Sequence, residues 1–113
     1  DETGRNEVTA RGLTDLLTSI WNDTAASPEQ CQWMRQLHGG QQHRDRLPRC
    51  LPEGVSYAGK TGTLEGISHD IGVIDGPSGA VAVAALVESS ADHHYDDDVY
   101  LGRIGLAIGE IVS

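Results

Sequence analysis

The hydrophobic positions near the start of the chain repeat with helical spacing. Apolar side chains recur at i, i+3, i+4, i+7 and i+8, which predicts a first helix over residues 9–22. Thr9 is suited to cap its start, because its hydroxyl can accept a backbone N–H of the first turn. The apolar stripe consists of Leu13, Leu16, Leu17, Ile20 and Trp21.

A second helix is predicted over residues 28–38. Ser27 and Gln30 have the spacing of a capping box, and Pro28 between them suits the first helical position. The pair Gly39-Gly40 is expected to end this helix. Trp33 within it, like Trp21 before it, is interpreted as a core residue.

Strand-like segments follow, at residues 55–63, 69–75 and 80–87. The turn "GPSG" between the last two has residues that suit a tight reversal, and the short connections predict an antiparallel meander. The third segment, "AVAVAALV", is apolar on both faces. This pattern is typical of a strand in the middle of a sheet, so we expect it to be covered on both sides.

A final helix is predicted over residues 97–112, with a stripe of apolar residues and an acidic start that suits the positive end of a helix. Between the second helix and the first strand, residues 41–54 are polar. We expect an ordered loop there, anchored by Leu47 and Leu51. The order of elements predicts one unit over residues 1–113 of the α/β (α+β) class, with an antiparallel meander flanked by helices.

Composition and charge exclude some functions. Seventeen acidic and eight basic side chains give a net charge of −9, which is unlike the basic face of a nucleic-acid-binding protein. No apolar run reaches the length of a membrane span. The start "DETGRNEV" has neither a secretory signal pattern nor an initiator Met, so we expect the chain to be part of a longer gene product. Cys31 and Cys50 can be free or paired.

The stretch "YAGKTGTLEG" concentrates candidate chemistry around Lys60. Gly59 and Gly62 remove side-chain bulk, so a ligand can approach the backbone closely. Thr61 and Thr63 add hydroxyl groups, and the strand adds backbone N–H groups. Such a set can hold a carboxylate and meet a developing oxyanion; the alternative is a solvated lysine on a strand with turn glycines.

Lys60-Thr61-Gly62 matches K-[ST]-G, the third motif of the class A β-lactamases and their penicillin-recognising relatives. The segments "VTARGLTDLL", "SPEQC" and "RLPRCLPEGVSYAGKTGT" resemble the same family in the same order. The resemblance covers nearly the whole chain but only the C-terminal part of the family's domain. It implies the C-terminal portion of the β-lactamase/transpeptidase-like fold.

The resemblance also implies site residues. Lys60 would attract the substrate carboxylate and tune the field at the nucleophile. Thr61 would hydrogen-bond the same carboxylate, and Gly62 would belong to the substrate-binding residues. Thr63 would lend its backbone N–H to the oxyanion hole. Arg46 stands fourteen residues before Lys60, where some members place a carboxylate-binding arginine. His69 would be a weaker, pH-dependent substitute for an arginine on the facing strand, or simply a strand-edge residue paired with Asp70.

The family nucleophile and base are missing. No serine is followed three positions later by a lysine, no S-D-N occurs, and by spacing the deacylating glutamate would precede the first residue. We therefore expect the chain to be a C-terminal fragment of a longer parent protein, and the parent to hydrolyse β-lactams through an acyl-serine. The fragment alone is expected to be inactive. The alternatives are a D-Ala-D-Ala peptidase or esterase relative, and a non-catalytic binding or interaction module.

Partners follow from the same reading. The parent would bind a β-lactam or a related amide or ester, without a cofactor, and would be secreted or in the cell envelope. This chain would associate with its missing N-terminal half or form a homodimer through the bare edge of residues 80–87. A metal site in "DHHYDDD", residues 92–98, is the less favoured interpretation, because the spacing matches no defined ligand pattern; an acidic helix start is favoured.

Overall fold

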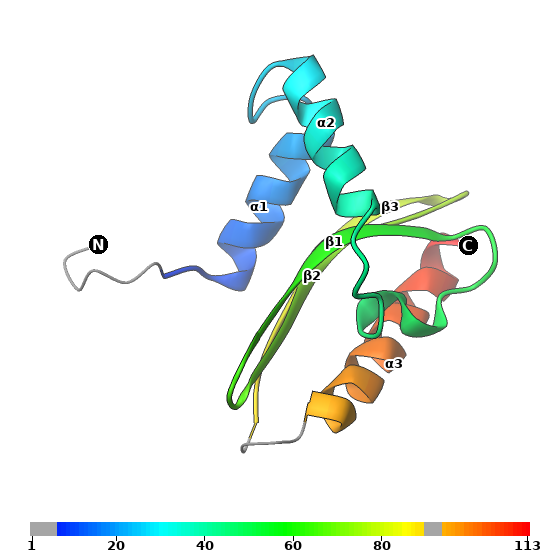
Figure 1. Ribbon diagram of the computed structural model, residues 1–113. Helices are drawn as coiled ribbons and strands as arrows, with labels where there is room; N and C mark the ends of the chain where they lie inside the picture. The colour runs from blue at the N-terminus through cyan, green and yellow to red at the C-terminus, as the bar shows by residue number, and fades with distance from the viewer. Residues whose placement is uncertain (1–6, 90–93) are drawn as a thin grey trace.

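The computed structural model describes residues 7–89 and 94–113. In these residues a three-stranded sheet separates two layers of helices: α1 and α2 lie on one side and α3 on the other (Figure 1). This arrangement confirms the predicted α+β class with an antiparallel meander. The elements are α1 (Ala10–Trp21), α2 (Pro28–Gly39), the 3₁₀ helix η1 (Leu47–Cys50), β1 (Ser56–Leu64), β2 (Ile67–Gly76), β3 (Gly79–Glu88) and α3 (His94–Val112).

The starts of α1 and α2 are fixed by the predicted caps. Thr9 Oγ1 accepts a hydrogen bond from the Gly12 N–H at 3.0 Å. Ser27 and Gln30 form both bonds of a capping box, at 3.2 and 3.3 Å. Each bond satisfies a backbone donor that has no partner within the helix, so local sequence alone sets these boundaries.

The sheet has the order β1-β2-β3 with antiparallel pairing throughout. Among the described strands β3 therefore lies at an edge, and the prediction that it lies in the middle of the sheet is wrong. The expectation that both of its faces are covered holds only in part, because helices approach both faces but leave some side chains partly exposed. Val81 and Leu86 are 37% and 36% exposed. Its small apolar residues reflect the close approach of α1 on one face and of α3 on the other, and not a central position.

The core lies between the sheet and α3. Leu47, Tyr57, Ile74 and Val112 are buried there, and Leu47 is completely inaccessible, which confirms its role as the anchor of the loop. The loop packs so closely on α3 that a Cβ on Gly105 would overlap the backbone carbonyl of Leu47. Gly102 and Gly109 face the same segment, so glycines along one side of α3 set this contact.

Helix α3 begins at His94, three residues before the predicted start. Asp96 and Asp97 lie in its first turn, where their charge favours the positive end of the helix dipole. Residues 92 and 93 of the acidic segment lie outside the described residues. Within the part of the chain that the structure describes, no helix is long and apolar enough to cross a bilayer.

Trp33 does not belong to the core, contrary to the prediction, because it lies on the outer side of α2 and is 63% exposed. Trp21 is half-buried. Cys31 and Cys50 are both free; Cys31 is buried and Cys50 is exposed.

The packing of η1 on α3 predicts opposite effects for two helical glycines. Gly105→Ala should lower the free energy of unfolding by about 3 kcal/mol, because the new methyl group meets backbone that cannot move aside. Gly39→Ala in α2 is the matched control, since nothing lies within 4 Å of the added methyl group. It should be neutral or stabilising by about 0.5–1 kcal/mol. Urea unfolding measures both, and equal effects would contradict this account of the contact.

Candidate functional site

Strand β1 forms one wall of an open cavity of about 430 Å³. Side chains alternate across a strand, so Lys60 points to the α1/α2 side of the sheet while Thr61 and Thr63 point to the α3 side. Because β1 is an edge strand, the cavity reaches side chains of both faces around that edge. Its lining comes from the loop before η1, from β1 and from α3: His43, Asp45, Arg46, Lys60, Thr61, Thr63 and Asp98.

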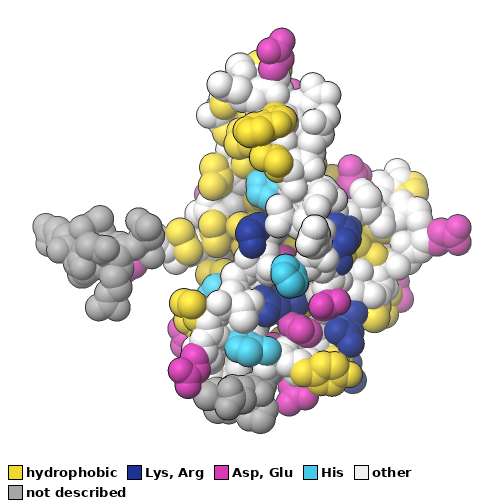
Figure 2. All heavy atoms as spheres, in the orientation of Figure 1, with side chains coloured by type: hydrophobic (Ala, Val, Ile, Leu, Met, Phe, Trp, Pro, Cys, Tyr) yellow, Lys and Arg dark blue, Asp and Glu magenta, His cyan; other side chains and the backbone are white. Residues whose placement is uncertain are grey.

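Charged side chains gather around this part of the molecule, whereas hydrophobic side chains are exposed over α2 (Figure 2). Lys60 is exposed, and its Nζ donates to the carbonyl of Thr61 at 2.8 Å. The described residues contain two salt bridges, Arg35–Asp23 and Arg46–Asp98. Lys60 takes part in neither, so its charge faces the cavity without a described carboxylate partner.

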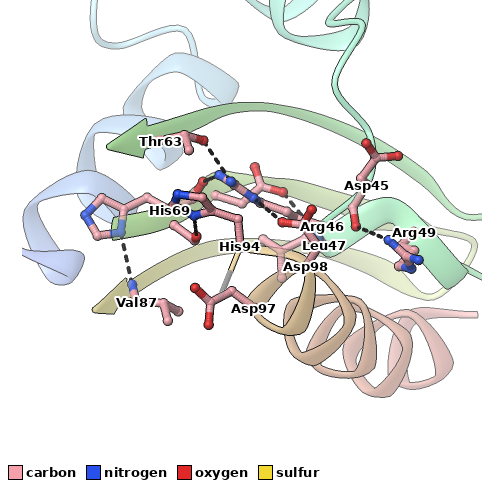
Figure 3. A network of polar contacts seen from close by, with 12 residues as sticks. Asp45, Arg46, Leu47, Arg49, Thr63, His69, Val87, His94, Asp97 and Asp98 are labelled. Atoms are coloured by element: carbon pink, nitrogen blue, oxygen red, sulfur yellow. Dashed lines mark hydrogen bonds and ion pairs between the residues drawn. The ribbon is translucent and has the colours of Figure 1, made fainter. Parts of the chain in front are cut away.

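Arg46 is buried, with 6% of its surface exposed, and its guanidinium binds four groups. Nε donates to Asp98 Oδ1 at 2.7 Å, and Nη2 donates to Thr63 Oγ1 at 2.7 Å. Nη1 donates to the carbonyls of Gly62 and His69 at 3.2 and 2.8 Å. Figure 3 shows Arg46 at the centre of this network. We call these five residues the Arg46 clamp.

The clamp joins three elements at the wall of the cavity. Gly62 and His69 face each other in the β1–β2 register, so Nη1 bridges a cross-strand pair, while Asp98 brings in α3. A buried guanidinium needs a counter-charge and satisfied donors. Asp98 supplies the charge. The carbonyls of Gly62 and His69 and the hydroxyl of Thr63 accept the other hydrogen bonds, and these bonds hold the segment around Thr63 in place. The sequence predicted Arg46 but gave no sign that Asp98 would be its partner.

His69 does not line the cavity. Its Nδ1 accepts a hydrogen bond from the Val87 N–H at 2.9 Å, and its carbonyl belongs to the Arg46 clamp. The interpretation of His69 as paired with Asp70 is wrong, because the Asp70 carboxylate faces the other side of the sheet and has other partners.

Sequence reasoning missed a buried pair beneath the site. Tyr57 donates its hydroxyl to Asp70 Oδ1 at 2.5 Å, and the Leu47 N–H donates to Asp70 Oδ2 at 3.0 Å. Burial raises the pKa of the Asp70 carboxyl, an effect that the hydrogen bonds from Tyr57 and Leu47 partly offset. Burial, followed by the Asp70 charge, also raises the pKa of Tyr57. The pair fixes β1 and β2 to the start of η1.

The two glycines beside Lys60 have different roles. A Cβ on Gly59 would collide with the Tyr57 ring and with the Ile71 carbonyl. Gly59 therefore makes room for Tyr57, whereas the sequence had suggested that it makes room for a ligand. At Gly62 the nearest atom to an added Cβ is His69 Cβ, at 3.8 Å. Gly72 opposite Gly59 also accommodates Tyr57, and a tyrosine between cross-strand glycines is the signal that would have revealed the pair.

The acidic start of α3 provides structural bonds. Ser68 Oγ and His94 Nδ1 are 2.7 Å apart, and Ser89 Oγ donates to Asp97 Oδ2 at 2.8 Å. Within residues 7–89 and 94–113, no three His, Cys, Asp or Glu side chains are placed to hold a metal ion. Residues 92 and 93 lie outside this range.

Comparison with known proteins shows which family this chain resembles. Residues 1–112 match the family model described as the beta-lactamase enzyme family. The chain is 34% identical over 97 residues to the beta-lactamase regulatory protein BlaB of Streptomyces cacaoi. That match covers 74% of this chain and 31% of the relative, so the chain spans about a third of the length of this curated relative.

Solved structures share the fold. A beta-lactamase from Sphaerobacter thermophilus is 29% identical, with a TM-score of 0.78 over 90% of this chain and 40% of its own. The TLA-3 extended-spectrum beta-lactamase and PBP-A, at 23% and 22% identity, have TM-scores of 0.82 and 0.83 and are each covered to 42%. The chain therefore has the fold of about two fifths of these proteins.

The Asp70 carboxyl predicts a pH dependence of stability. Because burial raises the pKa of the Asp70 carboxyl above its ordinary value, the folded state keeps a proton that the unfolded state has already released. Its contribution to stability is thus greatest below about pH 4 and declines as the pH rises through the raised pKa. Asp70→Asn keeps an acceptor for the Leu47 N–H and removes the titration. From pH 4 to 7 the wild type should lose stability relative to this variant, as measured by urea unfolding. If the free energies of unfolding of the two proteins change in parallel with pH, the pKa of Asp70 is not raised in the folded state.

Proposed function

This chain belongs to the beta-lactamase enzyme family, and we propose that it forms the substrate-carboxylate and oxyanion wall of a serine hydrolase that opens β-lactams. The observation that carries the proposal is the cavity beside β1, where Lys60, Thr61 and Thr63 present an ammonium group and two threonines together. A cation and neutral donors on one wall suit an anionic ligand that also carries a reactive carbonyl.

Each residue has a defined role in the proposal. Lys60 attracts the substrate carboxylate, because no described carboxylate neutralises its charge. Thr61 hydrogen-bonds the same carboxylate, Gly62 leaves space for it, and the Thr63 N–H stabilises the oxyanion of the acylation step.

Arg46 acts mainly by holding this wall. Its charge is compensated by Asp98 at 2.7 Å, and three further contacts use its donors on Gly62, His69 and Thr63. Among the described residues, four of its five N–H groups have a partner, and the fifth, on Nη2, is left for a ligand. We propose that Arg46 orients the Thr63 hydroxyl and adds this single donor to the carboxylate site, while His69, outside the cavity lining, plays a lesser part.

The nucleophile and the base belong to the parent protein in this proposal. No S-x-x-K occurs in the sequence, and the chain spans 40% of the Sphaerobacter beta-lactamase. The chain alone should therefore not turn over a β-lactam. By the same resemblance we propose that the parent is exported.

A non-catalytic binding module is the second candidate function. The observation behind it is the 34% identity to a protein named as regulatory. A parent that binds a β-lactam without hydrolysing it would support this candidate, whereas turnover of D-Ala-D-Ala peptides or esters in preference to β-lactams would support a peptidase or esterase.

The cavity can be tested with the chain itself. Titration with benzylpenicillin, followed by the amide signals in ¹H–¹⁵N NMR, should shift the signals of residues 60–63. Lys60→Ala should weaken binding by roughly tenfold, because it removes a charge-assisted contact. Arg103→Ala, which removes an exposed cation from α3, is the matched control and should bind like the wild type. Unshifted signals at millimolar ligand, or equal binding by the Lys60 variant, would refute the assignment.

The exposed edge of β3 predicts association. We propose that it pairs with the missing part of the parent or, in the isolated chain, with a second copy, because the strand carries neither lysine nor proline to block pairing. Sedimentation should detect dimers at about 100 µM, weakened roughly tenfold by Val81→Lys. Ile111→Lys, at a residue of α3 that is 76% exposed, should leave association unchanged. A wild-type chain that stays monomeric at every concentration would argue against edge pairing.

A further inference from the structure

His69 connects two parts of the sheet through different atoms. Its carbonyl accepts from Arg46 Nη1 at 2.8 Å, and its Nδ1 accepts from the Val87 N–H of β3 at 2.9 Å (Figure 3). Val87 is the second-last residue of β3, whose range ends at Glu88. One residue of the central strand therefore contacts both the Arg46 clamp and the end of the edge strand.

The bond to Val87 defines the protonation of the imidazole. A backbone N–H is only a donor, so Nδ1 must present its lone pair and the ring must be neutral, with its proton on Nε2. Proton uptake at Nδ1 would place two N–H groups against each other and remove the bond. The contact between His94 Nδ1 and Ser68 Oγ at 2.7 Å differs, because a hydroxyl can accept as well as donate and therefore tolerates either form of the ring.

The charges around His69 are of both signs. Lys60 on β1 and Glu88 on β3 share its face of the sheet, which α1 covers, and no described hydrogen bond or ion pair joins either of them to the ring. Arg46 contacts the residue itself, because its Nη1 donates to the His69 carbonyl at 2.8 Å. Helix α1 carries Arg11 and Asp15, both exposed. The opposite face of the sheet holds Tyr57, Asp70 and the charged or titratable residues of α3, which are His94, Tyr95, Asp96, Asp97, Asp98, Tyr100, Arg103 and Glu110.

We propose that His69 is a pH-sensitive latch, which holds the end of β3 on β2 only while its imidazole is neutral. A protonated imidazole carries an N–H on both ring nitrogens, so acid removes the acceptor of the Val87 N–H. The stability that this bond supplies is present at higher pH and is lost as the pH falls. Beyond the end of β3 the chain continues to α3, which carries Asp98 of the Arg46 clamp, so opening of the latch loosens the frame of the cavity.

Amide hydrogen exchange tests the latch without any ligand, so its result is independent of the proposed hydrolase function. Between about pH 7.5 and 5.0 the protection of the Val87 amide, corrected for intrinsic exchange, should fall by roughly tenfold or more in the wild type. His69→Asn places an amide oxygen at the position of Nδ1 and does not titrate, so its protection should not depend on pH. His43→Asn removes an exposed histidine of the cavity and should show the wild-type fall.

The ring nitrogens of His69 provide a second test in the wild-type chain. At pH 7.5 their ¹⁵N shifts should show an unprotonated Nδ1 and a protonated Nε2. A proton on Nδ1 at this pH would overturn the proposal, as would the same loss of Val87 protection in His69→Asn. If the Asn variant does not fold, the ring-nitrogen shifts and the exchange profile of the wild type still decide between these outcomes.

Discussion

The guanidinium of Arg46 is the group on which the site depends. A buried cation is stable only with a counter-charge and with partners for its donors, and here these come from three elements that are distant in sequence. Asp98 is 52 residues away, and Gly62 and Thr63 are 16 and 17 residues away. The same group therefore links β1, β2 and α3 at the wall of the cavity.

The clamp in turn requires the close packing of η1 on α3. Leu47, the neighbour of Arg46, is buried against Gly105, and its N–H donates to Asp70 at 3.0 Å. Asp70 then binds Tyr57, which lies across Gly59 and Gly72. A continuous set of buried contacts therefore leads from the glycines of α3 to the strand that carries Lys60, and the polar members are paired throughout, as their burial requires.

Local patterns in the sequence predicted the helix caps, the meander and the anchor at Leu47, because each depends on neighbouring residues. The errors concern relations between distant elements. The apolar residues of β3 could not distinguish an edge covered by helices from a central strand, and periodicity alone placed Trp33 in a core that α2 does not extend to. Asp98 was missed because a side-chain partner 52 residues away leaves no local pattern. Asp70 was missed because Gly59 was interpreted as space for a ligand and not as space for the Tyr57 ring. The roles of Lys60, Thr61 and Thr63 came from a motif and stay predictions.

The central claim is that an anionic ligand meets Lys60 and the threonines of β1, while Arg46 keeps its internal partners. A crystal structure of the chain with a bound penicillin tests this most directly. We expect the carboxylate within hydrogen-bond distance of Lys60 Nζ and a threonine hydroxyl, with the Arg46–Asp98 contact still near 2.7 Å. A ligand bound outside this cavity, or an Arg46 that has left Asp98 to pair with the ligand, would contradict the account.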